Sequence, residues 1–351
     1  MTAGLYIHIP FCSVKCFYCD FTAFSGQGRI AARYLLALEA EARLSPRLDF
    51  KTLYIGGGTP SELSADEIEV LLSGAGKGTW TEATFEANPE SLDELKLETL
   101  RRGGINRLSL GLQTADDLLL KSIGRKHDFA QFSKVYRAAR RTSGFSIGVD
   151  LMYGLPGQSL ESCLDSLEKV LALGPDHLSL YGLQVEDRTL FSKRGVETDE
   201  DLGREMFDAS LDRIAAAGLI HYEISNFARP GHQSAHNLNY WRDGEYLGLG
   251  CGASSFVGGV RSSNLERLGE YCVAVEAGRR PTAESESLTG KSRLGERAML
   301  GLREIEGIEA GPALESAFAA EFDQLERRGL LRRDGPRRRL TREGIFLANE
   351  A

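Results

Sequence analysis

The sequence predicts an α/β protein: a partial TIM-like barrel of six strand–helix units, (β/α)6, followed by a small helical, winged-helix-like domain. Two observations lead to this fold class. Short apolar segments alternate with longer segments whose apolar residues recur every three or four positions, as parallel strands alternate with covering helices. The chain also has 351 residues, of which 42% are hydrophobic, which is enough for one large core and a smaller one.

The six predicted strands are short, apolar and often β-branched. They are Leu5–Ile9, Thr52–Ile55, Thr84–Ala87, Arg107–Leu110, Phe145–Leu151 and His177–Leu183. In such a barrel the C-terminal ends of the strands meet on one side, where ligand-binding residues gather. Polar residues that follow the strands are therefore candidates for a functional site.

Helical patterns lie between the strands. Ser64–Glu67 has the capping-box pattern that opens a helix. Two apolar stripes at helical spacing predict further helices. The stripes consist of Ile30, Tyr34, Leu35 and Leu38, and of Leu160, Leu164, Leu167 and Leu171.

Changes of composition divide the chain into a barrel of residues 1–220, a connecting segment of residues 221–278 and a C-terminal domain of residues 279–351. The last part begins with a polar, turn-rich stretch, residues 279–292, which predicts a linker. Two helical patterns, an Asp-Gly turn between two short runs and a closing helical stretch follow, and they predict helices around a hairpin. These elements are expected at 293–302, 312–328, 329–340 and 341–350.

Eight arginines lie between Arg327 and Arg342, which keeps nucleic-acid binding open as an interpretation. No aromatic residue is interleaved with them, and the whole chain has a formal net charge of −8. A solvated hairpin is therefore the preferred interpretation.

The composition also limits the class of protein. No run of eighteen apolar residues predicts a membrane span, and the first residues do not have the pattern of a signal peptide. Three of the six cysteines are scattered, unlike those of a disulfide-stabilised secreted domain. The chain is therefore expected in the reducing cytoplasm.

The other three cysteines, Cys12, Cys16 and Cys19, fall within eight positions in the spacing C-x3-C-x2-C. A disulfide would leave one thiol over, and zinc would need a fourth ligand, for which His8 is the nearest candidate. Three thiolates on one loop can instead hold three irons of a [4Fe–4S] cluster and leave the fourth iron open. The spacing favours the cluster over zinc or chance.

Gly56–Pro60 follows the second predicted strand and contains three consecutive glycines, whose backbone can approach a ligand closely. Taken alone, this stretch is an ordinary turn before a helix. Polar residues near other strand ends predict a ring around a charged ligand. They are Glu86, Gln113, Arg125 and Asp150. Carboxylates can hold hydroxyl or ammonium groups, and arginine can hold a carboxylate bidentately.

The cysteine spacing, with Tyr18 directly before the last cysteine, resembles the radical S-adenosylmethionine (SAM) superfamily. The resemblance implies a [4Fe–4S] cluster whose open iron is chelated by the amino and carboxylate groups of SAM, and an electron transfer that breaks SAM to a 5′-deoxyadenosyl radical. It also implies that the glycine stretch meets the methionine amino group of SAM.

Further segments resemble the branch that contains oxygen-independent coproporphyrinogen III oxidase and a heme chaperone. In chain order they are LYIHIPFCSVKCFYCDF, TLYIGGGTP, FEANPESL, RLSLGLQT, SIGRKH and GVDLMYGLPGQ. By motif match, the resemblance implies SAM contacts at Tyr6, Tyr18, Gly57, Gly58, Thr59, Glu86, Gln113, Arg125 and Asp150. In the oxidase some of these residues serve a second SAM. The number of SAM molecules bound here, one or two, is therefore left open.

Two features of the oxidase are not found or not expected in this chain, and their absence favours the chaperone. The oxidase has a further cysteine where this chain has Phe21. The oxidase also has an additional N-terminal segment, which we do not expect here because Cys12 lies so near the start. One departure from many relatives is Ser254, which stands where histidine is expected.

A third feature is HNLNYW, residues 236–241, which matches the H-N-x-x-Y-W signature associated with heme binding in the chaperone. The resemblance therefore implies heme contact by His236, Tyr240 and Trp241. His232 is an alternative ligand, and a packed corner between domains is the structural alternative.

Together these features predict a protein that binds heme and transfers it to a target protein, on a scaffold that holds a [4Fe–4S] cluster and SAM. The alternatives are an oxidase that decarboxylates coproporphyrinogen III and a radical SAM enzyme that modifies RNA. The expected partners are heme, a heme-receiving protein and, if SAM is cleaved, an electron donor.

Overall fold

The computed structural model describes residues 3–26, 28–76 and 80–348. Its main element is a twelve-stranded mixed sheet in which the strands follow one another in a linear order. From one edge to the other they are β14 (Thr282–Ser287), β13 (Val260–Asn264), β12 (Ser254–Val257), β11 (Tyr246–Leu249), β1 (Ala3–Ile9), β4 (Phe50–Gly57), β5 (Glu82–Ala87), β6 (Arg107–Gln113), β7 (Ser146–Tyr153), β8 (His177–Gly182), β10 (Asn226–Ala228) and β9 (Ile220–Glu223).

Most of the described helices connect or follow these strands. They are α1 (Ala31–Leu44), α2 (Ala65–Ala75), α3 (Glu94–Arg102), α4 (Asp117–Ser122), α5 (Phe129–Arg141), α6 (Leu160–Ala172), α7 (Leu190–Lys193), α8 (Glu200–Ala216), α9 (Ala235–Trp241), α10 (Leu268–Glu276), α11 (Gly290–Gly301), α12 (Pro312–Arg327) and α13 (Arg342–Phe346). Short 3-10 helices span Gly28–Ile30 and Pro60–Glu62, and a separate two-stranded sheet pairs β2 (Phe11–Cys12) with β3 (Phe24–Ser25).

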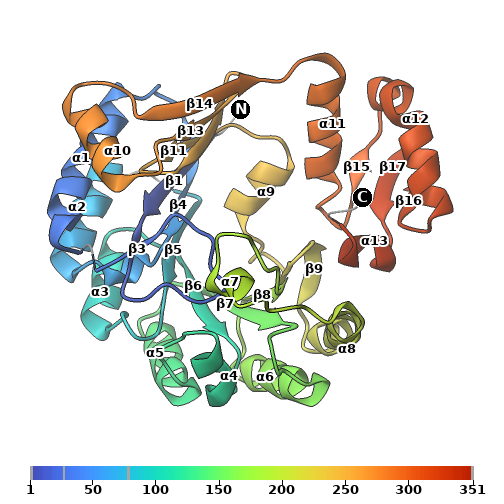
Figure 1. Ribbon diagram of the computed structural model, residues 1–351, viewed down its shortest axis with the longest axis horizontal. Helices are drawn as coiled ribbons and strands as arrows, with labels where there is room; N and C mark the ends of the chain where they lie inside the picture. The colour runs from blue at the N-terminus through green and yellow to red at the C-terminus, as the bar shows by residue number, and fades with distance from the viewer. Residues whose placement is uncertain (1–2, 27, 77–79, 349–351) are drawn as a thin grey trace.

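The strands β1, β4, β5, β6, β7 and β8 are successive parallel neighbours, and each corresponds to one predicted strand. This confirms the predicted α/β class. In Figure 1 these strands curve in an arc, with α1 to α6 and α8 on the outer side and α9 on the inner side. The seventh parallel strand, β11, lies beside β1 and comes from the segment that follows the predicted barrel.

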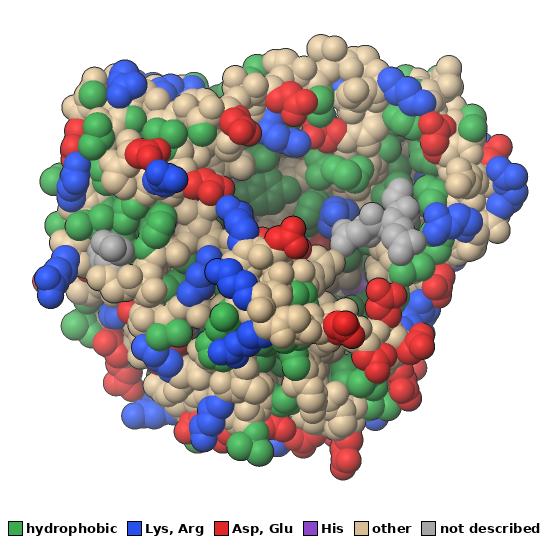
Figure 2. Space-filling view, in the orientation of Figure 1, with side chains coloured by type: hydrophobic (Ala, Val, Ile, Leu, Met, Phe, Trp, Pro, Cys, Tyr) green, Lys and Arg blue, Asp and Glu red, His purple; other side chains and the backbone are tan. Residues whose placement is uncertain are grey.

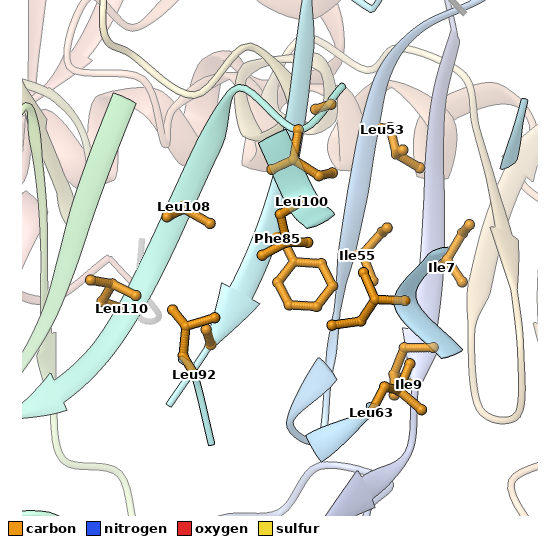
Figure 3. Packing of buried hydrophobic residues seen from close by; sticks show 14 of the residues in the cluster. Ile7, Ile9, Leu53, Ile55, Leu63, Phe85, Leu92, Leu100, Leu108 and Leu110 are labelled. Carbon is orange, nitrogen blue, oxygen red and sulfur yellow. The ribbon is translucent and has the colours of Figure 1, made fainter. Parts of the chain in front are cut away.

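The core lies between the parallel strands and the outer helices. Alternate strand residues such as Ile7, Ile55, Phe85 and Leu108 are buried and pack together on the helix-covered side of the sheet (Figure 3). Because side chains alternate between the two faces of a strand, the residues between them point to the inner side of the arc. The sequence pattern of each strand thus sets which residues can form a site.

The predicted helix signals are confirmed, with one difference in detail. Ser64 and Glu67 form a complete capping box at the start of α2. Helix α6 begins at Leu160, the first residue of the predicted stripe, but its buried face includes Cys163, Ser166, Leu167 and Val170. The leucine stripe therefore predicted the helix correctly but predicted only part of its buried face, because small residues also face the core.

The predicted linker at 279–292 is wrong. Residues Thr282–Ser287 form β14, which pairs antiparallel with β13 at the edge of the main sheet. All six residues of β14 are exposed. The strand pairs with β13 through its main chain, and its exposed, mostly polar side chains give no apolar periodicity by which a strand could be predicted.

The C-terminal part has its own small core and a three-stranded sheet, which comprises β15 (Ile308–Glu309), β17 (Arg337–Leu340) and β16 (Leu331–Asp334). The predicted hairpin is confirmed, with Asp334 opposite Arg337 and Gly335 at a φ of 57° in the turn. The closing helix α13 is shorter than predicted, and residues 349–351 lie outside the described part. The three-part division of the chain stays a prediction.

Three arginines of the hairpin, Arg333, Arg338 and Arg339, lie within ion-pair distance of acidic side chains. Arg338 is buried and its guanidinium lies 2.6 Å from the carboxylate of Glu315. Arg339 lies 2.9 Å from the carboxylate of Asp334. These ion pairs support the solvated-hairpin interpretation, since paired guanidinium groups are less available to phosphates. Within the described residues, no helix is both long enough and apolar enough to cross a membrane.

Candidate functional site

The three clustered cysteines lie in the segment that follows β1, with Cys12 at the end of β2, at the C-terminal end of the parallel strands. All three are partly exposed free thiols. The amide of Cys19 donates to the carbonyl of Cys16 at 3.2 Å, and Cys12 Sγ lies 3.2 Å from Thr59 Oγ1. The loop is also fixed to the barrel, because the amide of Phe17 donates to the carbonyl of Ile123.

The cysteines face a cavity of about 300 Å³ at the mouth of the strands. Most of the residues predicted to contact SAM line the same cavity. They are Tyr18, Gly57, Gly58, Thr59, Glu86, Gln113, Arg125 and Asp150. The structure thus brings together residues from the ends or following loops of five parallel strands, as expected for polar residues at strand ends.

The glycine stretch fits closely under the cysteine loop. The amide of Gly58 donates to the carbonyl of Ile9, and the amide of Thr59 donates to that of Phe11. Gly57 has a φ of 112°, and a Cβ at this position would lie 2.4 Å from the ring of His8. Only glycine meets both requirements without displacing a neighbour.

Two half-buried carboxylates, Glu86 and Asp150, and the half-buried guanidinium of Arg125 give the cavity its electrostatic character. Burial raises the pKa of Glu86 to about 7, and the nearby charge of Asp150 also raises it. Burial likewise raises the pKa of Asp150, although Ser109 donates hydrogen bonds of 3.1 and 3.2 Å to its two oxygens. The charge of Arg125 acts in the opposite direction and lowers the pKa of Asp150.

Arg125 donates to Asn88 Oδ1 at 2.9 Å and to the carbonyl of Gly111 at 3.2 Å. Its Nε is buried and has no hydrogen-bond partner among the described residues. An unsatisfied buried donor of a charged group is unfavourable unless a ligand completes it. The nearby Gln113 has a φ of 76° beside a register irregularity in β6, which is the kind of local strain found at ligand sites.

This donor set fits the cluster and SAM. Three thiols on one loop can serve three irons, while the carboxylates and Arg125 can meet ammonium, hydroxyl and carboxylate groups. Among the described residues, no group of three or more His, Cys, Asp or Glu side chains is arranged around a single metal ion. His8, the candidate fourth zinc ligand, instead bonds the Tyr6 hydroxyl and the carbonyl of Thr22.

A second chamber of about 460 Å³ adjoins the first, and the two share Phe21, Gly57 and Glu86. Tyr6, predicted as a SAM contact, lines this second chamber with Tyr240. The remaining lining residues include Tyr246, Ser254, Arg188 and Glu266. Figure 2 shows a hollow lined by hydrophobic side chains over the position of α9, with charged side chains at its rim.

The predicted heme residues lie in different surroundings. Tyr240 faces the second chamber, whereas His236 is fully buried and both of its ring nitrogens are hydrogen-bonded. Trp241 stacks with the guanidinium of Arg303. His232 bonds Ser146 at the start of β7, at the opposite end of the strands from the cysteines. The heme role of these residues stays a prediction.

The cavity residues that were not predicted include Asn88, Ser109, Met152 and Tyr181. Ser109, Met152 and Tyr181 occupy inward-facing positions of β6, β7 and β8, two residues from other inward-facing positions. Strict alternation along the strands could have identified them. Asn88 directly follows β5, so the alternation of side chains along the strand does not extend to it. The direction of its side chain depends on the turn that follows the strand.

The chain is similar to known proteins along most of its length. Residues 6–170 match the model of the radical SAM superfamily. The chain is 35% identical to the heme chaperone HemW of Bacillus subtilis, an alignment that covers 98% of this chain and 97% of that protein. It is 42% identical to the heme chaperone HemW of Escherichia coli over 71% of this chain and 69% of that protein.

A solved structure has a similar fold over nearly the whole chain. It is that of the coproporphyrinogen III oxidase HemN from Escherichia coli, described as a radical SAM enzyme. The TM-score is 0.86, the sequence identity is 24%, and the similarity covers 99% of this chain and 88% of that one.

Proposed function

The chain belongs to the HemW family within the radical SAM superfamily, and we propose on that premise that it binds heme and transfers it to a target protein. The main observation that supports this proposal is the similarity to heme chaperones along 98% of the chain. The partly exposed aromatic chamber beside the cysteine cavity supports the proposal, because a carrier must both admit and release a flat apolar ligand.

The cysteine cavity is the proposed site of the [4Fe–4S] cluster and SAM. Cys12, Cys16 and Cys19 would hold the cluster, which when bound supplies reducing electrons and an open iron. The Gly57–Thr59 backbone leaves room for the ligand to approach. Arg125 has an unsatisfied buried Nε available for an acceptor.

The two carboxylates of the cavity are held in orientation by different neighbours. Glu86 accepts from the hydroxyl of Tyr54 and from the amide of Gly57, so its orientation is fixed in the absence of a ligand. Asp150 is oriented by Ser109 on the neighbouring strand. Fixed acceptors of this kind can select the ammonium and hydroxyl groups of SAM with little reorganisation.

Heme contact is proposed for Tyr240 and for the aromatic wall that it shares with Tyr6 and Tyr246. Aromatic side chains suit the face of a porphyrin. Arg188 at the same chamber can meet a propionate, although it also lies 3.2 Å from the carboxylate of Glu266. The scattered remaining cysteines support a reducing, cytoplasmic setting for this exchange.

The test is one experiment on one sample. The purified full chain is reconstituted anaerobically, titrated with heme, and then assayed for consumption of coproporphyrinogen III. We expect saturable heme binding, transfer of that heme to a heme-free acceptor protein, and no turnover of coproporphyrinogen III. Rapid conversion of coproporphyrinogen III to protoporphyrinogen IX would favour the oxidase instead.

A further inference from the structure

The H-N-x-x-Y-W segment forms helix α9, and two strands of the parallel core hold it in place. The side chain of Ser234 caps the helix through the amide of Asn237. The carboxylate of Glu82 in β5 accepts from the amides of Ala235 and His236, both at 2.9 Å. A carboxylate at a helix N-terminus satisfies donors that otherwise have no partner. Helix α9 is thereby fixed on the inner side of the sheet (Figure 1).

The ring of His236 is enclosed and fully hydrogen-bonded. His236 has 0% of its surface exposed. Nδ1 lies 2.8 Å from Thr52 Oγ1 in β4, and Nε2 lies 2.7 Å from the hydroxyl of Tyr240. A Cβ at Gly4 would lie 2.9 Å from the ring, so β1 has a glycine where the histidine packs. Burial lowers the pKa of His236 to about 3, which leaves the ring neutral.

A short series of contacts connects this ring to the cysteine cavity. The ring centroids of His236 and Tyr54 lie 5.2 Å apart. The hydroxyl of Tyr54 donates to Glu86 Oε1 at 2.6 Å. The other oxygen of Glu86 accepts from the amide of Gly57 at 3.1 Å. Groups that are packed and hydrogen-bonded at these distances shift together, because protein interiors have little free volume.

We propose that His236 is a positioning residue, which holds Tyr240 in the wall of the second chamber and, through Tyr54, holds Glu86 in the wall shared by both cavities. The proposal rests on the proposed function, because it takes the cysteine cavity as the SAM site. It assigns the histidine of the H-N-x-x-Y-W segment to the geometry of SAM binding. Axial coordination of heme by His236 would first require one of its two ring hydrogen bonds to break.

The test is a double-mutant cycle on SAM affinity, with the anaerobically reconstituted full chain. The variants are His236→Ala, Glu86→Gln and both together. We expect His236→Ala to weaken SAM binding about tenfold in the parent background, the loss typical of a displaced hydrogen bond to a charged group. In the Glu86→Gln background, we expect the same change to weaken binding by less than about twofold, because the two residues act as one unit.

The matched control is His221→Ala. His221 is another histidine with a burial-lowered pKa, and it stacks on Phe227 away from both cavities. We expect this variant to lose stability without loss of SAM affinity. If His236→Ala does not fold, as judged by its thermal melting curve, Thr52→Val provides the test, since it removes one ring hydrogen bond with little change in volume. Its smaller loss of SAM affinity should also vanish in the Glu86→Gln background.

Three outcomes would contradict the proposal, each for a different reason. Equal losses from the His236 change in both backgrounds would mean a general structural role and overturn the proposal. Unchanged SAM affinity in His236→Ala, with an altered heme absorption spectrum, would overturn it in favour of a heme ligand. If Glu86→Gln alone leaves SAM affinity unchanged, the SAM site itself is misplaced, and the proposed function fails at that point together with the positioning role.

Discussion

The hydroxyl of Tyr271 in α10 donates a 2.6 Å hydrogen bond to Oε2 of Glu41 in α1, across 230 residues of sequence. The same carboxylate accepts from the amide of Gly250 at 2.8 Å and from Asn264 Nδ2 at 2.6 Å. Glu41 is buried, with 1% of its surface exposed. One carboxylate thus joins the first helix of the parallel core to the segment that carries β11 to β13.

Replacement of Glu41 by alanine should destabilise the protein strongly. Three buried donors would lose their acceptor, and each unsatisfied donor costs roughly 1–3 kcal/mol. We expect the free energy of unfolding to fall by about 3 kcal/mol or more in urea titrations. Glu39→Ala is the matched control, because Glu39 pairs with Arg43 on the exposed face of the same helix, and it should change stability by less than about 0.5 kcal/mol. Equal effects of the two changes would contradict the role given to Glu41.

Each of the substitutions Cys12→Ser, Cys16→Ser and Cys19→Ser should abolish stable binding of the cluster. A serine cannot supply the thiolate that each iron requires. After anaerobic reconstitution, we expect the iron content and the broad visible absorbance to fall to background. Cys163→Ser is the control, because Cys163 is buried in α6 away from the cavity. Stoichiometric zinc without iron in the parent protein would contradict the cluster assignment.

Gly57→Val should prevent SAM binding. The new side chain would project into the ring of His8, from a backbone conformation that valine rarely adopts. We expect loss of measurable SAM binding by calorimetry, together with lower stability. Gly74→Ala is the matched control, since a Cβ built at this helical position has no atom within 4 Å apart from its chain neighbours and the backbone of its own helix. It should keep SAM binding and gain about 0.5 kcal/mol of stability.

Glu86→Gln should make stability less dependent on pH. The folded-state pKa of Glu86 is raised from 4.5 to about 7, chiefly by burial. Between these values the folded state keeps a proton that the unfolded state releases, so stability is highest below the lower value and falls as pH rises through the upper one. Urea titrations at pH 5 and pH 8 should show that the parent loses about 2 kcal/mol more than the variant. A larger loss in the variant would refute the raised pKa.

Much of the fold could be predicted because the parallel strands carry their own pattern. Residues such as Ile55, Phe85 and Leu108 recur at strand spacing within short apolar segments, and each segment proved to be a strand. The segment Thr282–Ser287 could not be predicted, because its strand is held by main-chain bonds while its side chains face solvent. The Glu41 contacts were also missed, since nothing local to α1 reveals partners that lie more than 200 residues away.

The candidate site, like the fold, could be predicted from the sequence only in part. Cys12, Cys16 and Cys19 lie on one loop, so their spacing alone indicates the chemistry of their ligand. Parallel strands bring their C-terminal ends together, so the strand pattern alone could place polar residues such as Glu86 and Asp150 at one cavity. The amino-acid sequence by itself therefore determined the fold class, the cysteine site and its polar rim.

Only the tertiary structure decided what surrounds each of these groups. His236 has the same place in the sequence motif whether it faces a ligand or the core, and its enclosure depends on Thr52 and Gly4 from strands far away in the chain. The second chamber likewise combines Tyr240 of α9 with Tyr6 of β1 and Arg188, which lie far apart in the chain. Burial and hydrogen-bond geometry arise from contacts between distant segments, whereas a motif records only neighbours along the chain.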